Sequence, residues 1–132
     1  MKQTADKWFS KYIRLRDCLR TTGTNTHGVC CTCGKIVPFA GGDCGHFISR
    51  DRLSLRYCEE NAHFQCRECN RFRSGNQAVH MLHVNELHGA GTAESLLSQE
   101  ILEKSNPYKF KKTKADYKAI ADYYRKKFRE LK

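Results

Sequence analysis

The chain has 132 residues, of which 39% are hydrophobic and 29% charged, and it carries a formal net charge of +10. This length suits one domain with a modest core, so we expect residues 1–132 to form a single domain. No apolar run reaches the roughly 18 residues that cross a membrane, and the first residues lack the apolar stretch of a secretion signal. We therefore expect no membrane partner and a reducing, cytoplasmic location.

The positive charge is concentrated at the two ends of the chain. Residues 1–20 contain six Lys or Arg and two Asp or Glu, residues 21–108 contain eight and nine, and residues 109–132 contain ten and three. Basic flanks around a nearly neutral centre favour a polyanionic partner such as nucleic acid. The alternative is a lysine-rich surface that only keeps the protein in solution.

Helical spacing of apolar residues predicts a first helix over residues 4–19, capped by Thr4. A metal-binding turn and short strands are expected over residues 29–48, followed by a polar, Arg-rich connection over 49–60. The next helix is predicted to begin at the second cysteine pair and to run over residues 66–87.

Two more helices are predicted in the last third of the chain. Thr92 can cap a helix over residues 93–104, and Thr113 with Asp116 resembles a capping box at the start of the last helix. The apolar face of that last helix suits packing on the first helix or on a second subunit. It consists of Tyr117, Ile120, Tyr124, Phe128 and Leu131.

Two Cys-x-x-Cys pairs, Cys30 with Cys33 and Cys66 with Cys69, carry the strongest signal in the chain. In a cytosolic protein such pairs indicate a metal site rather than disulfides. Zn²⁺ takes four ligands in a tetrahedron, and a site closed by four sulfurs is structural. Cys31 is a rival ligand within the first pair.

The remaining cysteines, Cys18, Cys44 and Cys58, have no partner at ligand spacing, and we interpret them as small buried apolar residues. A second metal site that uses His27, Cys44 or Cys58 stays open as an alternative.

Polar residues that suit phosphodiester chemistry lie between and beside the cysteine pairs. His46 follows Asp43 and Gly45, Asn61 comes fifteen residues after His46, and Asn70 directly follows the last cysteine. Across residues 28–76 this order resembles the HNH, or His-Me finger, nuclease superfamily. Three segments, residues 8–17, 45–50 and 66–76, resemble the phage recombination protein family NinG (Rap). That resemblance covers about residues 6–100, and phage endonuclease VII is a more distant likeness.

The resemblance implies an α+β fold in three parts. An N-terminal helix over 1–20 precedes a zinc-bound ββα-metal, or treble-clef, core over 28–88, and a basic helical extension covers 92–132. It also implies a metal-dependent DNA endonuclease that acts on branched recombination intermediates such as Holliday junctions and D-loops. A homodimer is expected because two symmetric cuts resolve a four-way junction, and the location would be the host cytoplasm if a phage encodes the chain.

Each site residue then has an expected role. His46 is the general base, and Asn61 holds its loop and orients it. Asp43 and Asn70 supply oxygen ligands for Mg²⁺ or Mn²⁺. Many HNH proteins place Asp or His directly before the catalytic histidine, where this chain has Gly45. Either Asp43 reaches the metal from three residues back or the glycine marks a lost ligand.

Basic residues are candidates for phosphate contacts: each arginine beside the site could equally be plain surface charge, whereas the lysines before the last helix favour contact with the DNA backbone. The candidates are Arg50, Arg67, Arg71, Arg73, Lys111 and Lys112. His63 is interpreted as a packing residue or one that supports the zinc site, with a direct catalytic part as the alternative. His80, His83 and His88 are interpreted as surface or packing residues.

Two other functions compete with this hypothesis. In a non-catalytic zinc module that binds DNA through its basic flanks, His46, Asn61 and Asn70 would be incidental polar residues. A sequence-specific nickase or restriction-type HNH enzyme is the third reading, which the NinG-like flanks disfavour.

Overall fold

A computed structural model describes all residues 1–132 and shows four α-helices with two small antiparallel sheets. The α+β class is therefore confirmed. The helices are α1 (Lys2–Thr22), α2 (Gln77–His88), α3 (Thr92–Ser105) and α4 (Lys114–Leu131). Strand β1 (His27–Val29) pairs with β2 (Ile36–Pro38), and β3 (Gly42–His46) pairs with β4 (Ala62–Cys66). None of the helices is both long and apolar enough to span a bilayer.

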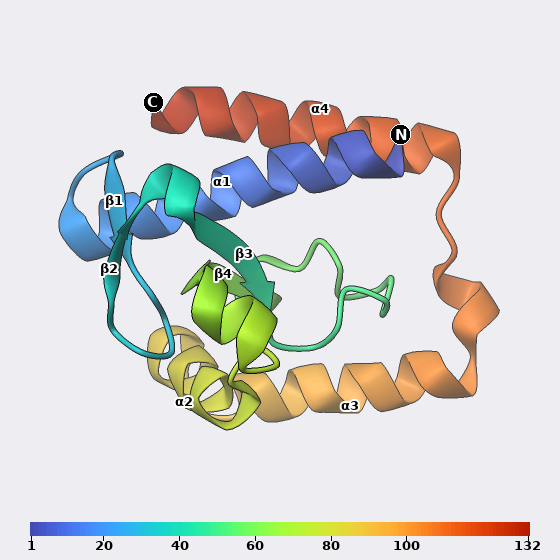
Figure 1. The fold of residues 1–132 in the computed structure, drawn as a ribbon. Helices are drawn as coiled ribbons and strands as arrows, with labels where there is room; N and C mark the ends of the chain where they lie inside the picture. The colour runs from blue at the N-terminus through green and yellow to red at the C-terminus, as the bar shows by residue number, and fades with distance from the viewer.

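The β3–β4 hairpin lies between two pairs of helices, with α1 and α4 on one side and α2 and α3 on the other (Figure 1). Helices α1 and α4 run side by side in the same direction. Their contact is aromatic, because the Phe9 and Tyr124 rings are 4.9 Å apart and the Tyr12 and Tyr124 rings 5.4 Å apart. The apolar face of the last helix thus packs on the first helix of the same chain.

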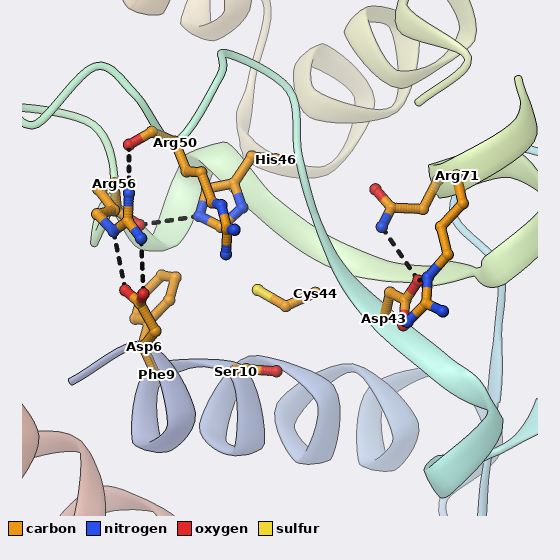
Figure 2. Close-up of a pocket in the computed structure, with 10 residues that line it drawn as sticks. Asp6, Phe9, Ser10, Asp43, Cys44, His46, Arg50, Arg56 and Arg71 are labelled. Carbon is orange, nitrogen blue, oxygen red and sulfur yellow. Dashed lines mark hydrogen bonds and ion pairs between the residues drawn. The ribbon is translucent and has the colours of Figure 1, made fainter. Parts of the chain in front are cut away.

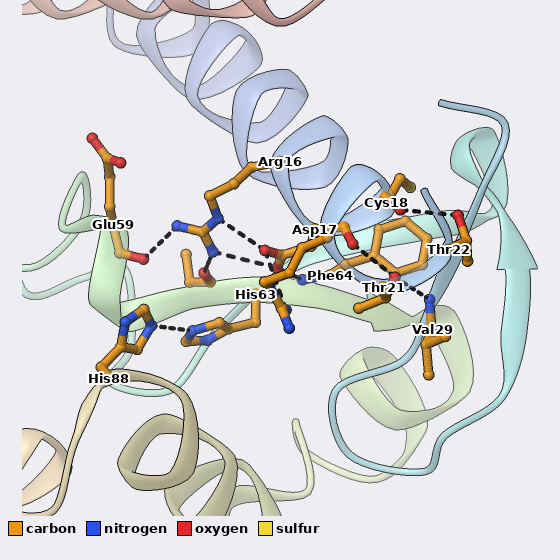
Figure 3. A network of polar contacts seen from close by, with 12 residues as sticks. Arg16, Asp17, Cys18, Thr21, Thr22, Val29, Glu59, His63, Phe64 and His88 are labelled. Carbon is orange, nitrogen blue, oxygen red and sulfur yellow. Dashed lines mark hydrogen bonds and ion pairs between the residues drawn. The ribbon is translucent and has the colours of Figure 1, made fainter. Parts of the chain in front are cut away.

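The buried side chain of Asp17 links α1 to strand β4 through hydrogen bonds (Figure 3). Its carboxylate accepts a hydrogen bond of 2.8 Å from the Phe64 backbone N–H and binds the Arg16 guanidinium. Arg16 in turn donates to the carbonyls of Glu59 and Ala62, at 2.9 and 2.8 Å. A buried carboxylate needs such donors, and here they hold the helix in a fixed position against the strand.

The predicted helix over residues 66–87 is wrong in its first half. Cys66 ends β4, and a short π-helical turn over Glu68–Phe72 follows it. Ser74, Gly75 and Asn76 then adopt positive φ values of 51°, 79° and 50°. Three consecutive left-handed residues cannot continue a right-handed helix, so α2 begins only at Gln77.

Helix starts were predicted with mixed success. Helix α1 begins before Thr4, with Met1 as its cap, and α3 is preceded by Gly91 while Thr92 is its first helical residue. The capping box of α4 is confirmed, since Thr113 N donates to the Asp116 carboxylate at 2.8 Å and Asp116 N to the Thr113 hydroxyl at 3.1 Å. In the capping box two residues cap each other, whereas Thr4 and Thr92 are single threonines with no second residue to support the prediction.

Candidate functional site

The four predicted cysteines come together between the turn after β1 and the end of β4. The sulfurs of Cys30, Cys33, Cys66 and Cys69 all lie within 4.8 Å of one another. Cys33 is exposed and the other three are buried. Four sulfurs at this spacing are compatible with a structural zinc ion, which takes four thiolate ligands in a tetrahedron.

Hydrogen bonds favour the thiolate form of Cys30, whereas burial raises the pKa of Cys33 and that of Cys66, the latter to about 12. Burial alone would raise the pKa of Cys30, but hydrogen bonds from the Thr32 hydroxyl and from nearby backbone amides lower it to about 6. The Cys69 N–H also donates to the Cys66 sulfur at 3.5 Å. The donor set therefore fits zinc, which binds thiolates.

The cysteines outside the cluster lie in other places. Cys31 does not belong to the group of four, although it is adjacent in sequence. Cys18 is fully buried, while Cys44 and Cys58 are half-buried and pack against apolar clusters. These positions suit the interpretation as small apolar residues. His27 lies exposed on β1 and bonds only its neighbour Thr26.

A polar cleft lies between α1, strand β3, the loop over residues 47–60 and the Glu68–Phe72 turn (Figure 2). Five of the residues predicted for the site line it, whereas Asn61, Arg67, Arg73, Lys111 and Lys112 do not. The lining consists of Asp6, Phe9, Ser10, Asp43, Cys44, His46, Arg50, Arg56, Asn70 and Arg71.

His46 ends strand β3 with its ring held in one orientation. Its Nε2 atom lies 2.9 Å from the carbonyl oxygen of Arg56, and because a carbonyl only accepts, Nε2 carries the proton. In the neutral ring, Nδ1 then keeps its lone pair. Phe9 packs against the ring, with the ring centroids 6.0 Å apart. Burial lowers the pKa of His46 below its usual value near 6.5, and the charges of Arg56 and Arg50 lower it further.

Asp43 and Asn70 meet at the other end of the cleft. The Asn70 amide donates to an Asp43 carboxylate oxygen at 3.1 Å, and Arg71 binds both carboxylate oxygens at 2.9 and 3.1 Å. Arg67 lies farther off, with its Nε atom 3.9 Å from Asp43. Asp43 and Asn70, the two predicted metal ligands, are thus in contact. In this structure the positive charge beside the Asp43 carboxylate is the Arg71 guanidinium.

Asn61 is buried behind the cleft and holds the loop that follows His46. Its side-chain oxygen accepts from the Ile48 N–H at 2.8 Å, and its amide donates to the carbonyls of Ile48 and Leu55 at 3.0 and 3.2 Å. Its own carbonyl accepts from the Phe47 N–H at 2.8 Å. These bonds go to the loop and not to the His46 ring, so Asn61 acts on the histidine through the backbone beside it.

The sequence interpretation missed the pair Asp6 and Arg56. The carboxylate of Asp6 on α1 accepts from Arg56 at 2.8 and 2.6 Å, and from the Tyr57 hydroxyl at 2.7 Å. Arg56 also donates to the Arg50 carbonyl at 3.0 Å. Fifty residues separate the two partners, and no local spacing signals such a pair. Helical periodicity places Asp6, Phe9 and Ser10 on one face of α1 but does not identify what that face meets.

The other predicted phosphate-binding residues lie outside the cleft. Arg67 donates to the Ala40 carbonyl at 2.7 Å, and Arg73 pairs with Glu68 at 3.1 Å on the exposed surface. Lys112 donates to the Leu53 carbonyl at 3.0 Å, and Lys111 lies over the Tyr108 ring. Arg67 and Arg73 keep most of their side chains in solvent, whereas Lys112 helps to hold the loop of the cleft.

Gly45 has a packing reason to be glycine. A Cβ atom at this position would lie 2.2 Å from the side-chain oxygen of Gln65 and 3.0 Å from its Cβ. Gln65 is fully buried and is held by bonds to Thr32 and to the Gly75 carbonyl, so it cannot move aside easily. The hairpin therefore leaves no room for a metal ligand directly before His46.

Comparisons with known proteins give one consistent result. A curated relative, the protein ninG of Salmonella phage P22, is 28% identical over 104 residues, which is 78% of this chain and 47% of the relative. The chain thus spans about half the length of the curated relative it matches. No solved structure matches it. A protein-family model, described as "Bacteriophage Lambda NinG protein", matches residues 1–132, so the chain belongs to the NinG family.

Proposed function

We propose that this NinG-family chain is a metal-dependent DNA endonuclease of the HNH type that cuts branched recombination intermediates, with His46 as its general base. The observation that carries the proposal is the hydrogen bond from His46 Nε2 to the Arg56 carbonyl inside a polar cleft. This bond leaves Nδ1 as a fixed base, and the lowered pKa of His46 keeps that base neutral at neutral pH.

In phosphodiester hydrolysis, the residues of the cleft have separate roles. Nδ1 of His46 takes the proton from the attacking water, while Phe9 and the Arg56 carbonyl hold the ring in place. Arg50 and Arg71 line the same cleft and can bind phosphate oxygens through their guanidinium forks. Asn61 is hydrogen-bonded to Ile48 and Leu55, and these bonds hold the loop that carries Arg50 and Arg56 in place next to His46.

Asp43 and Asn70 are the residues that would hold a divalent ion such as Mg²⁺ or Mn²⁺. Their side chains are already in contact at 3.1 Å, and half a turn of the Asn70 amide would present its oxygen beside the carboxylate. One carboxylate, one amide oxygen, waters and the substrate phosphate form an ordinary Mg²⁺ ligand set. When bound, the ion neutralises charge on the phosphate and on the leaving oxygen.

The local chain order supports the HNH assignment. Strands β3 and β4 form a hairpin, and the helical turn Glu68–Phe72 follows at once, so the zinc ligand Cys69 directly precedes Asn70. A zinc ion at the four cysteines would hold Asn70 opposite Asp43 on β3. In a ββα-metal core an α-helix takes this place, whereas here only the short π-helical turn Glu68–Phe72 follows β4 and α2 begins at Gln77.

The charge distribution supports DNA as the substrate. Helices α1 and α4 lie side by side (Figure 1), so the two basic ends of the chain come together. Helix α1 also lines the cleft, through Asp6, Phe9 and Ser10. The two basic ends suit contacts with several phosphates and carry no base-reading signal, which favours recognition of DNA shape. A homodimer would supply the two symmetric cuts that a four-way junction requires.

The test is cleavage of a labelled four-way junction beside a linear duplex of matched sequence, with Mg²⁺ and with EDTA. We expect junction-selective, Mg²⁺-dependent cuts that fall at least about 100-fold in His46→Ala, because a general base contributes about that much or more. DNA binding by His46→Ala should stay within about twofold of wild type. The control is His27→Ala, because His27 is exposed on β1 away from the cleft.

Tight DNA binding without cleavage in any divalent metal would contradict the proposal and favour the non-catalytic zinc module. Equal cleavage of many unrelated duplexes would argue against junction selectivity, and cutting at one sequence would favour a nickase.

A further inference from the structure

Four of the six histidines gather on the face of the β3–β4 hairpin opposite His46. His63 lies on β4, and His80, His83 and His88 come from α2. His63 and His80 are fully buried, whereas His83 and His88 are half-buried. The interpretation of the three α2 histidines as surface or packing residues does not explain why they converge on a fourth.

The contacts within the cluster run from ring to ring. His63 Nδ1 lies 2.9 Å from His80 Nε2, and His63 Nε2 lies 2.9 Å from His88 Nε2 (Figure 3 shows the contact with His88). The ring centroid of His83 is 5.0 Å from that of His63. Each neutral imidazole offers one N–H and one lone pair. His80 Nδ1 and His83 Nε2 are buried without any hydrogen-bond partner.

A buried nitrogen without a hydrogen-bond partner destabilises the folded protein. Imidazole lone pairs are, however, good ligands for Zn²⁺, Co²⁺, Ni²⁺ and Cu²⁺. A histidine that binds a metal usually has its other ring nitrogen hydrogen-bonded, which fixes the ring. His63 meets this requirement, because His80 faces its Nδ1 while its Nε2 points toward His88.

We propose that His63, His83 and His88 bind a divalent transition-metal ion such as zinc, with water as the fourth ligand and His80 as the partner of His63 Nδ1. Tetrahedral ligands at 2.0–2.1 Å from zinc are about 3.4 Å apart, so the 2.9 Å contact between His63 and His88 must open by a few tenths of an ångström. Unlike the cysteine sulfurs, the three ring nitrogens do not all lie within 4.8 Å of one another, so metal binding requires the buried Nε2 atom of His83 to move toward the other two rings.

A metal ion can reach the histidine site from solvent, and the charges around the site permit a cation to bind. His88 is the last residue of α2 and is half-buried, so an ion can enter from solvent beside it. The Arg16 guanidinium faces His63 and His88, but Asp17 is bonded to it at 2.8 Å and offsets its charge. The ion would tie the end of α2 to β4, whose last residue, Cys66, already belongs to the cysteine cluster.

The experiment counts zinc ions on the full-length protein after dialysis against a zinc buffer, by elemental analysis. In a second measurement, protein that carries only one equivalent of zinc, at the cysteine cluster, is titrated with Co²⁺ and followed by absorption. We expect two zinc ions per chain in wild type and one in His83→Ala and in His88→Ala. The Co²⁺ spectrum should lack thiolate charge-transfer bands, and its apparent affinity should fall at least tenfold in each variant. His27→Ala, which alters an exposed histidine outside the cluster, should keep both ions.

One zinc per chain in wild type would overturn the proposal, as would a second ion that persists in both histidine variants. Asp43→Asn shows whether a persistent ion lies in the cleft instead. The metal count does not depend on nuclease activity, so either proposal can fail without the other.

Discussion

The chemistry open to His46 depends on the hydrogen bond at its Nε2 atom. A histidine that is free to rotate could present either nitrogen to the cleft, but the Arg56 carbonyl selects the tautomer with the proton on Nε2. Burial, and after it the charges of Arg56 and Arg50, disfavour the protonated form of His46 and so lower its pKa.

The pH dependence of cleavage should report this environment. A base works in its neutral form, and the pKa of His46 lies below 6.5, so cleavage should be lost only as the pH falls below about 6.5. The measurement is the single-turnover rate on a junction between pH 5 and 8. Arg50→Gln removes one of the charges that lower the pKa, so it should move the inflection to higher pH. An inflection above 6.5 in wild type would show that another group controls the rate.

Asp6 should matter to His46 although it does not touch it. Asp6→Ala leaves the guanidinium of Arg56, whose side chain is 7% exposed, without its carboxylate, and we expect about 2–4 kcal/mol lower stability in urea unfolding. We also expect a lower cleavage rate at saturating DNA. The ¹⁵N shifts of the His46 ring should lose the signature of the Nε2–H tautomer.

The matched control for Asp6 is Asp122→Ala on α4, which removes an exposed ion pair with Lys118. Such pairs contribute at most about 1 kcal/mol, so stability and His46 shifts should hardly change. Unchanged His46 shifts in Asp6→Ala would limit Asp6 to a purely structural role.

At the scale of elements, the β3–β4 hairpin explains why a glycine precedes His46. The pair Gly45 and His63 lies directly across the two strands, and Gln65 covers the space where a side chain would start. The motif alone left open whether the glycine marks a lost ligand. The packing shows that this hairpin cannot hold a larger residue there, so Asp43 is the only carboxylate that β3 offers to the cleft.

Gly45→Asp should therefore damage the fold instead of restoring a metal ligand. We expect about 1–3 kcal/mol lower stability from overpacking, measured by urea unfolding, and no gain in Mg²⁺ affinity in cleavage assays. Gly41→Asp is the control, because its Cβ would meet Pro38 only at an ordinary 3.4 Å. Higher activity of Gly45→Asp at low Mg²⁺ would contradict this account.

The start of a helix was predictable only where two residues of the sequence cap each other. The capping box of Thr113 and Asp116 identified the start of α4, because each residue satisfies the other. The break at Ser74–Asn76 was missed, since the apolar spacing of residues 66–87 continues through it while the backbone turns left-handed. Single threonines such as Thr4 and Thr92 are weak signals, because a helix can begin before them when packing favours it.

At the scale of the whole molecule, the cysteine cluster joins the β1–β2 hairpin to the end of β4. The apolar core beside it is small, since one cluster has seven buried residues and the next has six. A zinc ion at the cysteine cluster would therefore add to the stability of the domain.

Cys66→Ser should unfold the central part of the protein, measured by circular dichroism and by zinc content. We expect loss of zinc and of the cooperative thermal transition, because metal binding and folding are coupled. Cys31→Ser is the matched control: Cys31 lies beside the first pair but outside the cluster, so this variant should keep its zinc. A folded Cys66→Ser protein without zinc would contradict a structural role for the ion.

The sequence by itself determined several features: the α+β class, the cluster of four cysteines, the capping box, and the neighbourhood of His46, Asp43 and Asn70. Short motifs, such as each Cys-x-x-Cys pair and Thr113 with Asp116, indicate these features in the sequence. Only the tertiary structure decided which distant groups meet, including Asp6 with Arg56, Asp17 with β4, and three α2 histidines with His63. Such contacts arise from how helices pack on the hairpin, and packing joins residues whose separation along the chain carries no signal.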